Sequence, residues 1–116
     1  MKNTLMLKKN YEFRKVLSRG KFFSGKFINA FIMENRKDYN LLGLAISVKT
    51  AKSVKRNRIK RLIRENYYFF ETKLKKGRGI VFLWNKEALV QNISFLKIKL
   101  DMEKIFDKAD MFENRK

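Results

Sequence analysis

The sequence predicts a single α+β domain, and three observations support this expectation. The apolar runs 26–34 and 41–48 have the composition and alternation of strands, whereas residues 51–76 carry the 3.6-residue period of a helix. The 116 residues contain no Pro, no Gly/Ser linker and no internal repeat, so we expect one domain over 1–116 with an acid-enriched end at about 101–116. Hydrophobic residues make up 45% of the chain, which is enough to build a core.

The first elements are expected to be a helix and two strands. Asn10 can cap the helix, Phe13, Val16 and Leu17 have helical spacing, and Gly20 is a suitable stop. The two apolar runs are joined by the polar segment 35–40 and should pair as antiparallel strands. Alternation places two sets of side chains on opposite faces of the first strand: Phe27, Asn29, Phe31 and Met33 on one, and Ile28, Ala30 and Ile32 on the other.

The second half of the chain should continue as helix, strand, helix. The helix over 51–76 has one apolar face, formed by Ile59, Leu62, Ile63, Asn66, Tyr67, Phe70 and Leu74. Gly77 and Gly79 end it, and residues 80–84 are expected to form a buried strand. A last helix is expected from near Glu87 to Lys108, with Leu89, Ile93, Leu96, Leu100 and Phe106 facing inward. The expected order is therefore α-β-β-α-β-α, with room for one further short strand.

Charge points to a polyanionic partner. Lys and Arg number 29 against 11 Asp and Glu, which gives a formal charge of +18, and residues 1–100 alone carry +19. The chain has no Cys and no His, which excludes thiolate nucleophiles, His-dependent triads and zinc fingers. No apolar run approaches the roughly 18 residues of a membrane-spanning helix. We expect a cytoplasmic protein with no membrane partner, no catalytic residue and no metal ligand of its own.

The stretch from Lys49 to Arg64 contains eight basic residues and no acid. A helical projection places Asn57, Arg61 and Arg64 in one row with Tyr68, opposite the apolar face. One guanidinium group can donate two hydrogen bonds to the oxygens of a phosphate, so this row predicts a phosphate-binding helix. A solvated charged face is the alternative, but such faces normally mix signs. A DNA-reading helix-turn-helix is disfavoured because its short paired helices are missing, and no DNA partner is expected.

These residues resemble the bacterial ribonuclease P protein subunit. The resemblance rests on Ser47-Val48-Lys49 followed by residues 54–65, VKRNRIKRLIRE, and on residues 7–16, LKKNYEFRKV, followed by Gly20. It covers roughly residues 5 to 105. It implies an α/β sandwich with a central mixed sheet and a left-handed crossover. It also implies an endonuclease that removes the 5′ leader of precursor tRNA, in which ribonuclease P RNA is the catalyst and binds most of the Mg²⁺.

The resemblance also implies two sets of RNA-binding residues. Those matching the family motif that faces the catalytic RNA are Arg56, Asn57, Arg58, Arg61 and Arg64, and we add Lys52 and Lys55 on charge alone. Those expected to hold the precursor tRNA leader are Phe13, Leu17, Phe31 and Lys49. The alternative for the aromatic residues is a purely core position. Relatives often carry an aromatic residue at the position of Leu17, and a basic pair where this chain has Trp84-Asn85-Lys86, so Trp84 is considered as a substitute stacking surface.

Composition alone also fits a different class of protein, a ribosomal or assembly protein that binds rRNA without taking part in cleavage. Leader dependence separates the two hypotheses, because an rRNA-binding protein has no reason to distinguish precursor from mature tRNA. A metal-dependent nuclease acting alone is disfavoured, because acidic residues are scarce.

Overall fold

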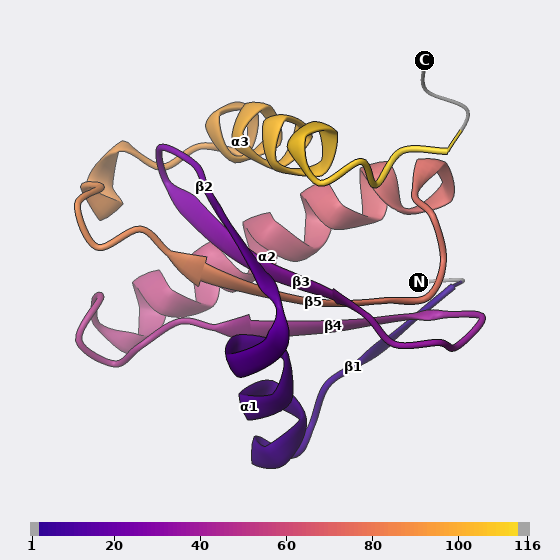
Figure 1. The fold of residues 1–116 in the computed structure, drawn as a ribbon. Helices are drawn as coiled ribbons and strands as arrows, with labels where there is room; N and C mark the ends of the chain where they lie inside the picture. The colour runs from indigo at the N-terminus through magenta and orange to yellow at the C-terminus, as the bar shows by residue number, and fades with distance from the viewer. Residues whose placement is uncertain (1–2, 114–116) are drawn as a thin grey trace.

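The computed structural model describes residues 3–113, which form a five-stranded mixed sheet with helices on both faces (Figure 1). The strands are β1 (Thr4–Met6), β2 (Lys21–Ser24), β3 (Ile28–Glu34), β4 (Asn40–Ala45) and β5 (Arg78–Trp84). The helices are α1 (Asn10–Arg19), α2 (Ser53–Phe70) and α3 (Phe95–Lys108), with short 3₁₀ helices η1 (Glu71–Lys73) and η2 (Val90–Asn92).

The strands lie side by side in the order β1-β4-β5-β3-β2. β4 is parallel to both β1 and β5, whereas β3 is antiparallel to both β5 and β2. Helix α2 connects the parallel neighbours β4 and β5. In Figure 1 both strands run from right to left, β5 lies above β4, and α2 passes behind the sheet. The connection is therefore left-handed, as the resemblance implied and against the usual preference.

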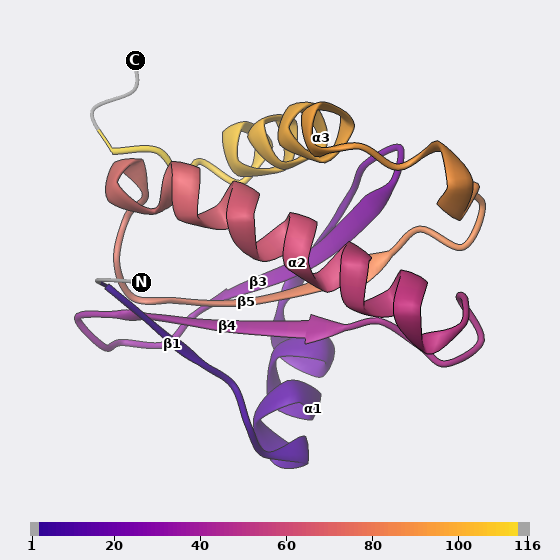
Figure 2. The same cartoon turned by 180° about the vertical axis from the view of Figure 1, so that it is seen from behind.

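The sheet has a large core on one face and a small one on the other. Helices α2 and α3 cover the first face, and α1 crosses the second (Figures 1 and 2). The predicted alternation of β3 is confirmed, because Ile28, Ala30 and Ile32 are buried against α2 and α3 while Phe31 and Met33 face α1. Phe27 departs from it. This residue precedes β3 and packs with the larger core beside Trp84.

Two expectations about strands were wrong. β3 and β4 run in opposite directions but do not pair, because β5 inserts between them. The structure also contains two short strands beyond the three expected ones, whereas only one further strand was predicted. They are β1, parallel to β4, and β2, antiparallel to β3. Both lie at sheet edges and have three or four residues, too few to show a clear period.

The helix limits also differ from expectation at several ends. Lys9, not Asn10, is the N-cap of α1, and the Glu12 carboxylate accepts its backbone N–H at 3.0 Å. Helix α2 ends at Phe70 and passes into η1, so Leu74 is buried beyond the helix.

For the last helix the expected start and inward face were partly wrong. Helix α3 begins at Phe95, where the Ser94 hydroxyl accepts the N–H of Lys97 at 3.2 Å. Leu89, Leu96 and Leu100 are exposed, while Ile93 and Phe106 are buried as predicted. The buried side chains of α3 are Ile98, Asp101, Met102, Ile105 and Phe106.

Candidate RNA-binding surfaces

Helix α2 presents a polar row to solvent because its other side is anchored in the core. Ile59, Ile63 and Tyr67 have no exposed surface. The opposite side carries the exposed side chains of the predicted row, Asn57, Arg61, Arg64 and Tyr68, together with the exposed Arg58 beside them. We call this set the α2 row. Forked guanidinium groups one or two turns apart on a rigid helix can each engage a phosphate along a nucleic-acid backbone.

The start of α2 adds to the positive potential. The N-cap residue is Lys52, whose side chain has no acceptor for the backbone N–H groups of the first turn, and that turn contains no acidic residue. The N–H groups of the first turn and the positive end of the helix dipole therefore favour an anion at the start of α2 and disfavour a cation. Lys55 is exposed there, but Arg56 is half-buried, and its guanidinium donates to the Ala51 carbonyl at 2.7 Å. Arg56 therefore also holds the loop that precedes the helix.

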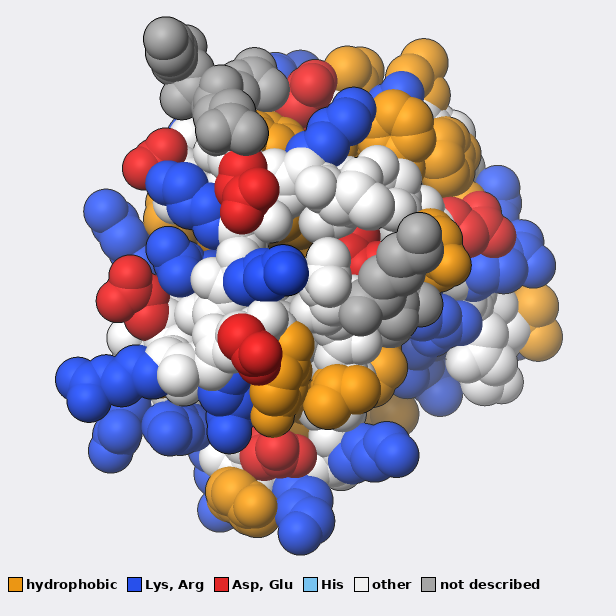
Figure 3. Space-filling view, turned by 90° about the vertical axis from the view of Figure 1, so that its right-hand side faces the viewer, with side chains coloured by type: hydrophobic (Ala, Val, Ile, Leu, Met, Phe, Trp, Pro, Cys, Tyr) orange, Lys and Arg blue, Asp and Glu red, His pale blue; other side chains and the backbone are white. Residues whose placement is uncertain are grey.

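Acidic side chains are unevenly placed around the molecule. Beside the α2 row stands Glu65, with its carboxylate 3.7 Å from the Arg61 guanidinium in an exposed pair. Figure 3 views the side on which the β3–β4 loop lies, and there Asp and Glu side chains are interspersed among Lys and Arg. The start of α2 lies at the opposite end of the sheet (Figures 1 and 2). Residues 49–64, which include the start of α2, carry eight basic residues and no acid, so this end attracts a polyanion.

On the other face of the sheet, the structure brings together three of the predicted leader residues. Phe13 and Leu17 of α1 and Phe31 of β3 are half-buried members of the small cluster built on Leu7, Val16 and Val81. Gly43 makes room for the Phe13 ring, since a Cβ at that position would lie 2.5 Å from Phe13 Cε1. These side chains are partly core and partly accessible, which both hypotheses for the aromatic residues allow.

Lys49 lies beside this cluster, in the loop after β4. A cavity of about 350 Å³ at the carboxyl ends of β4 and β5 is lined by Lys49 together with Ala45, Leu83 and Lys86. Ala45 and Leu83 also belong to the cluster under α1, so the cavity opens beside it. Trp84 borders the same cavity but is only 8% exposed, and its indole N–H donates to the Ala88 carbonyl at 3.1 Å. The idea that Trp84 supplies an open stacking surface was therefore wrong.

One aromatic residue on this face was missed by the sequence reasoning. Phe22 of β2 lies opposite Phe31, with ring centroids 5.0 Å apart, and is 50% exposed. The sequence offered only a partial signal, the aromatic pair Phe22-Phe23 directly after Gly20, because the strand register decides which of the two faces α1. We define the leader face as the four predicted residues Phe13, Leu17, Phe31 and Lys49; Phe22 lies at its edge.

The leader face and the α2 row lie on opposite sides of the sheet but approach each other at one end. The loop of residues 46–52 carries Lys49 and leads directly into Lys52 and the first turn of α2. The Lys49 end of the leader face and the start of α2 are therefore joined by a short loop.

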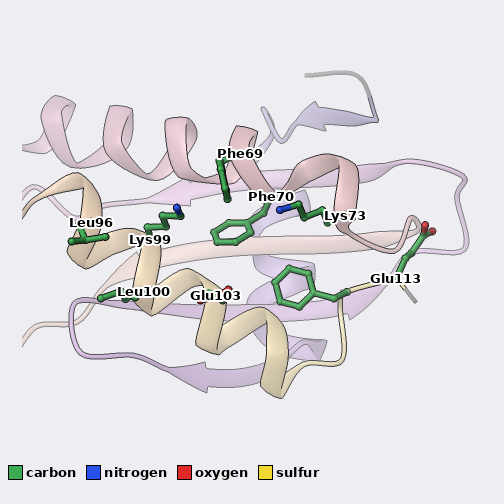
Figure 4. A pocket seen from close by; sticks show the side chains of 9 residues that line it. Phe69, Phe70, Lys73, Leu96, Lys99, Leu100, Glu103 and Glu113 are labelled. Atoms are coloured by element: carbon green, nitrogen blue, oxygen red, sulfur yellow. The ribbon is translucent and has the colours of Figure 1, made fainter. Parts of the chain in front are cut away.

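A larger cavity lies elsewhere and is lined by none of the predicted RNA-binding residues. It measures about 490 Å³ between the end of α2 and α3, where Lys99 lies 4.2 Å from the Phe69 ring centroid (Figure 4). Its charged lining mixes lysines with Glu103 and Glu113. Within residues 3–113, no three acidic side chains gather to hold a metal ion, and none of the described helices is long and apolar enough to cross a membrane.

Comparison with known proteins gives one consistent family. The family model described as Ribonuclease P matches residues 1–110. The ribonuclease P protein component of Clostridium kluyveri is 38% identical over 109 residues, covering 92% of this chain and 96% of the relative. That of Thermoanaerobacter sp. (strain X514) is 34% identical over 106 residues, covering 91% and 90%.

Solved structures agree with the sequence relatives. The RNase P protein of Staphylococcus aureus superposes with a TM-score of 0.82 at 25% identity, covering 93% of this chain and 97% of the other. The Thermotoga maritima RNase P protein gives a TM-score of 0.80 at 22% identity, covering 90% and 96%, and supports the fold. These relatives favour the ribonuclease P hypothesis over the rRNA-binding alternative.

Proposed function

We propose that this chain, which belongs to the ribonuclease P protein family, binds ribonuclease P RNA through the α2 row and the 5′ leader of precursor tRNA through the leader face. The arrangement that supports this is the approach of the two surfaces at the 46–52 loop. A protein that touches both RNAs at adjoining sites holds the substrate leader close to the catalyst, which lowers the entropic cost of their encounter.

Catalysis in this proposal belongs to the RNA. The chain has no His and no Cys, and its described acidic side chains do not cluster. We therefore assign Mg²⁺ to the phosphates of the RNA and no metal ligand to the protein. The contribution of the protein is affinity and orientation: arginine forks on the catalytic RNA, and ring faces with a lysine on the unpaired leader, in the cytoplasm where tRNA precursors are processed.

The leader face suits substrates of varied sequence. Stacking on an aromatic ring contributes about 1–3 kcal/mol per base and tolerates any base, because every base has a π face. Lys49 supplies a charge for the backbone phosphates without reading the sequence.

The deciding experiment is multiple-turnover cleavage of a leader-bearing precursor tRNA at low Mg²⁺. It compares a compatible ribonuclease P RNA alone, the protein alone, and the two together. Cleavage that is strong only in the mixture supports the proposal. Cleavage by the protein alone would place the chemistry in this chain, and an inactive mixture in which the protein still binds RNA would favour the rRNA-binding alternative.

A second measurement addresses the leader residues directly. Phe13→Ala should weaken binding of precursor tRNA to the assembled enzyme more than binding of mature tRNA. Equal losses for both ligands would show that Phe13 is only part of the core.

A further inference from the structure

We propose that Phe22, on edge strand β2, is a further leader-binding residue whose ring stacks on an unpaired base beside Phe31. The inference rests on the proposed function, since it extends the same face to the edge of the sheet.

The strand register places Phe22 on the correct face. Phe22 is the direct partner of Phe31 in the β2–β3 pairing, and residues directly opposite each other point to the same side of a sheet. Phe31 packs in the cluster under α1, so Phe22 also faces that side. The neighbouring Phe23 points to the other face, where the Lys21 ammonium lies 5.8 Å from its ring centroid.

The geometry of the pair leaves a prepared stacking surface. The two rings are tilted by 54° at a centroid distance of 5.0 Å, which holds the Phe22 ring in place while half of its surface stays exposed. A ring that is already held loses little conformational freedom when a base binds to it. An exposed Phe on an edge strand also favours aggregation, so its presence there is explained if a bound ligand covers the ring.

Polar groups adjoin the ring. Ser24 and Asn29 are paired in the same register and lie two residues along the same face, so a hydroxyl and a carboxamide are next to a stacked base. The Asn29 carboxamide oxygen already accepts the N–H of Gly25 at 3.3 Å. Leu17 on α1 offers no π face, so Phe22 adds an aromatic surface beside those of Phe13 and Phe31.

The test uses the enzyme assembled from ribonuclease P RNA and variant protein. Phe22→Ala should weaken binding of precursor tRNA with a long unpaired leader by about 5- to 100-fold, whereas mature tRNA is unaffected. Phe22→Tyr keeps the ring and should retain wild-type affinity. Phe23→Ala, on the opposite face of the same strand, is the matched control and should leave the preference for precursor unchanged, with folding of each variant checked by circular dichroism.

Shortening the leader provides a second readout that a structural role would not affect. The penalty of Phe22→Ala should vanish once the leader is too short to reach the edge strand. A penalty independent of leader length, or one that appears in the affinity for the catalytic RNA itself, would overturn the inference. If the wild-type enzyme prefers precursor tRNA and Phe22→Ala keeps that preference in full, this inference alone fails. If the wild-type enzyme shows no preference, the proposed function fails with it.

Discussion

The Tyr67 hydroxyl lies 2.7 Å from the Thr4 hydroxyl, so a buried hydrogen bond joins edge strand β1 to the last turn of α2. The Asn40 amide donates to the same phenol oxygen at 3.4 Å. Burial raises the pKa of Tyr67 above its usual value of 10.0, Glu71 adds a smaller raising effect, and the hydrogen bonds with Thr4 and Asn40 lower the pKa in part. The folded state therefore favours the protonated phenol.

This shift predicts a specific loss of stability at alkaline pH. Below about pH 10 Tyr67 is protonated in the folded and unfolded states, so its full contribution to the free energy of unfolding is present. Above about pH 10 the phenol ionises first in the unfolded state, and the free energy of unfolding falls as the pH rises through the raised pKa of the folded state. Tyr67→Phe should cost about 1 kcal/mol near neutral pH and should lack that extra alkaline loss. Denaturant unfolding at pH 7 and at several values above 9 tests this, with the exposed Tyr68→Phe as control. Parallel alkaline curves for wild type and Tyr67→Phe would contradict it.

The local elements could be predicted from the sequence, but their long-range arrangement could not. Helix α2 and the alternation of β3 could be predicted from periodicity. In each case the apolar residues repeat along one element, so the pattern is visible in the local sequence. The insertion of β5 between β3 and β4 depends on pairings such as Phe31↔Val81 and Leu42↔Ile80, which link residues far apart in the chain. No local pattern encodes that pairing, and the left-handed crossover that produces it was available only through the resemblance.

The last helix was misread for a physical reason. Leu96 and Leu100 form a second apolar stripe on α3 that is exposed, and this stripe competed with the buried one of Ile98, Met102 and Ile105. On the α1 side, resemblance indicated Phe13 and Phe31, but Phe22 required the register of a short edge strand that the sequence did not reveal.

Asp101 is predicted to be a major stabilising residue despite its charge. Its buried carboxylate accepts the backbone N–H groups of Lys26, Phe27 and Ile28 at 3.0, 2.6 and 3.0 Å, which fixes the β2–β3 turn against α3. Asp101→Asn replaces one acceptor oxygen with a donor and should lower the free energy of unfolding by about 3 kcal/mol. Chemical denaturation measures this, with the exposed Glu103→Gln on the same helix as control. Equal stability of the two variants would show that the turn does not depend on the carboxylate.

The α2 row predicts a change in salt dependence as well as in affinity. Each arginine that neutralises a phosphate should contribute about 0.7–0.9 to the slope of log K against log salt concentration. Arg61→Ala and Arg64→Ala should each reduce that slope for ribonuclease P RNA by about this amount while preserving the fold, since Ala favours helix. Binding titrations over a range of salt provide the measurement, and exposed Lys104→Ala on α3 is the control. Unchanged slopes in both arginine variants would remove α2 from the RNA interface.

Gly43→Ala is predicted to disturb the leader face from beneath. The added Cβ would lie 2.5 Å from Phe13 Cε1 and 3.0 Å from Leu7 Cδ1, so the ring and α1 must shift, at a stability cost of about 1–3 kcal/mol. The assembled enzyme should then lose part of its preference for precursor over mature tRNA, while affinity for ribonuclease P RNA is unchanged because α2 lies on the other face. Gly79→Ala is the matched control. Its Cβ would meet Val16 at 3.2 Å and Met33 at 3.5 Å, also on the α1 side, with no Phe13 atom among its three nearest neighbours, so it should affect stability and spare most of the preference. If Gly43→Ala keeps the full preference for precursor tRNA, the position of Phe13 does not matter for leader binding.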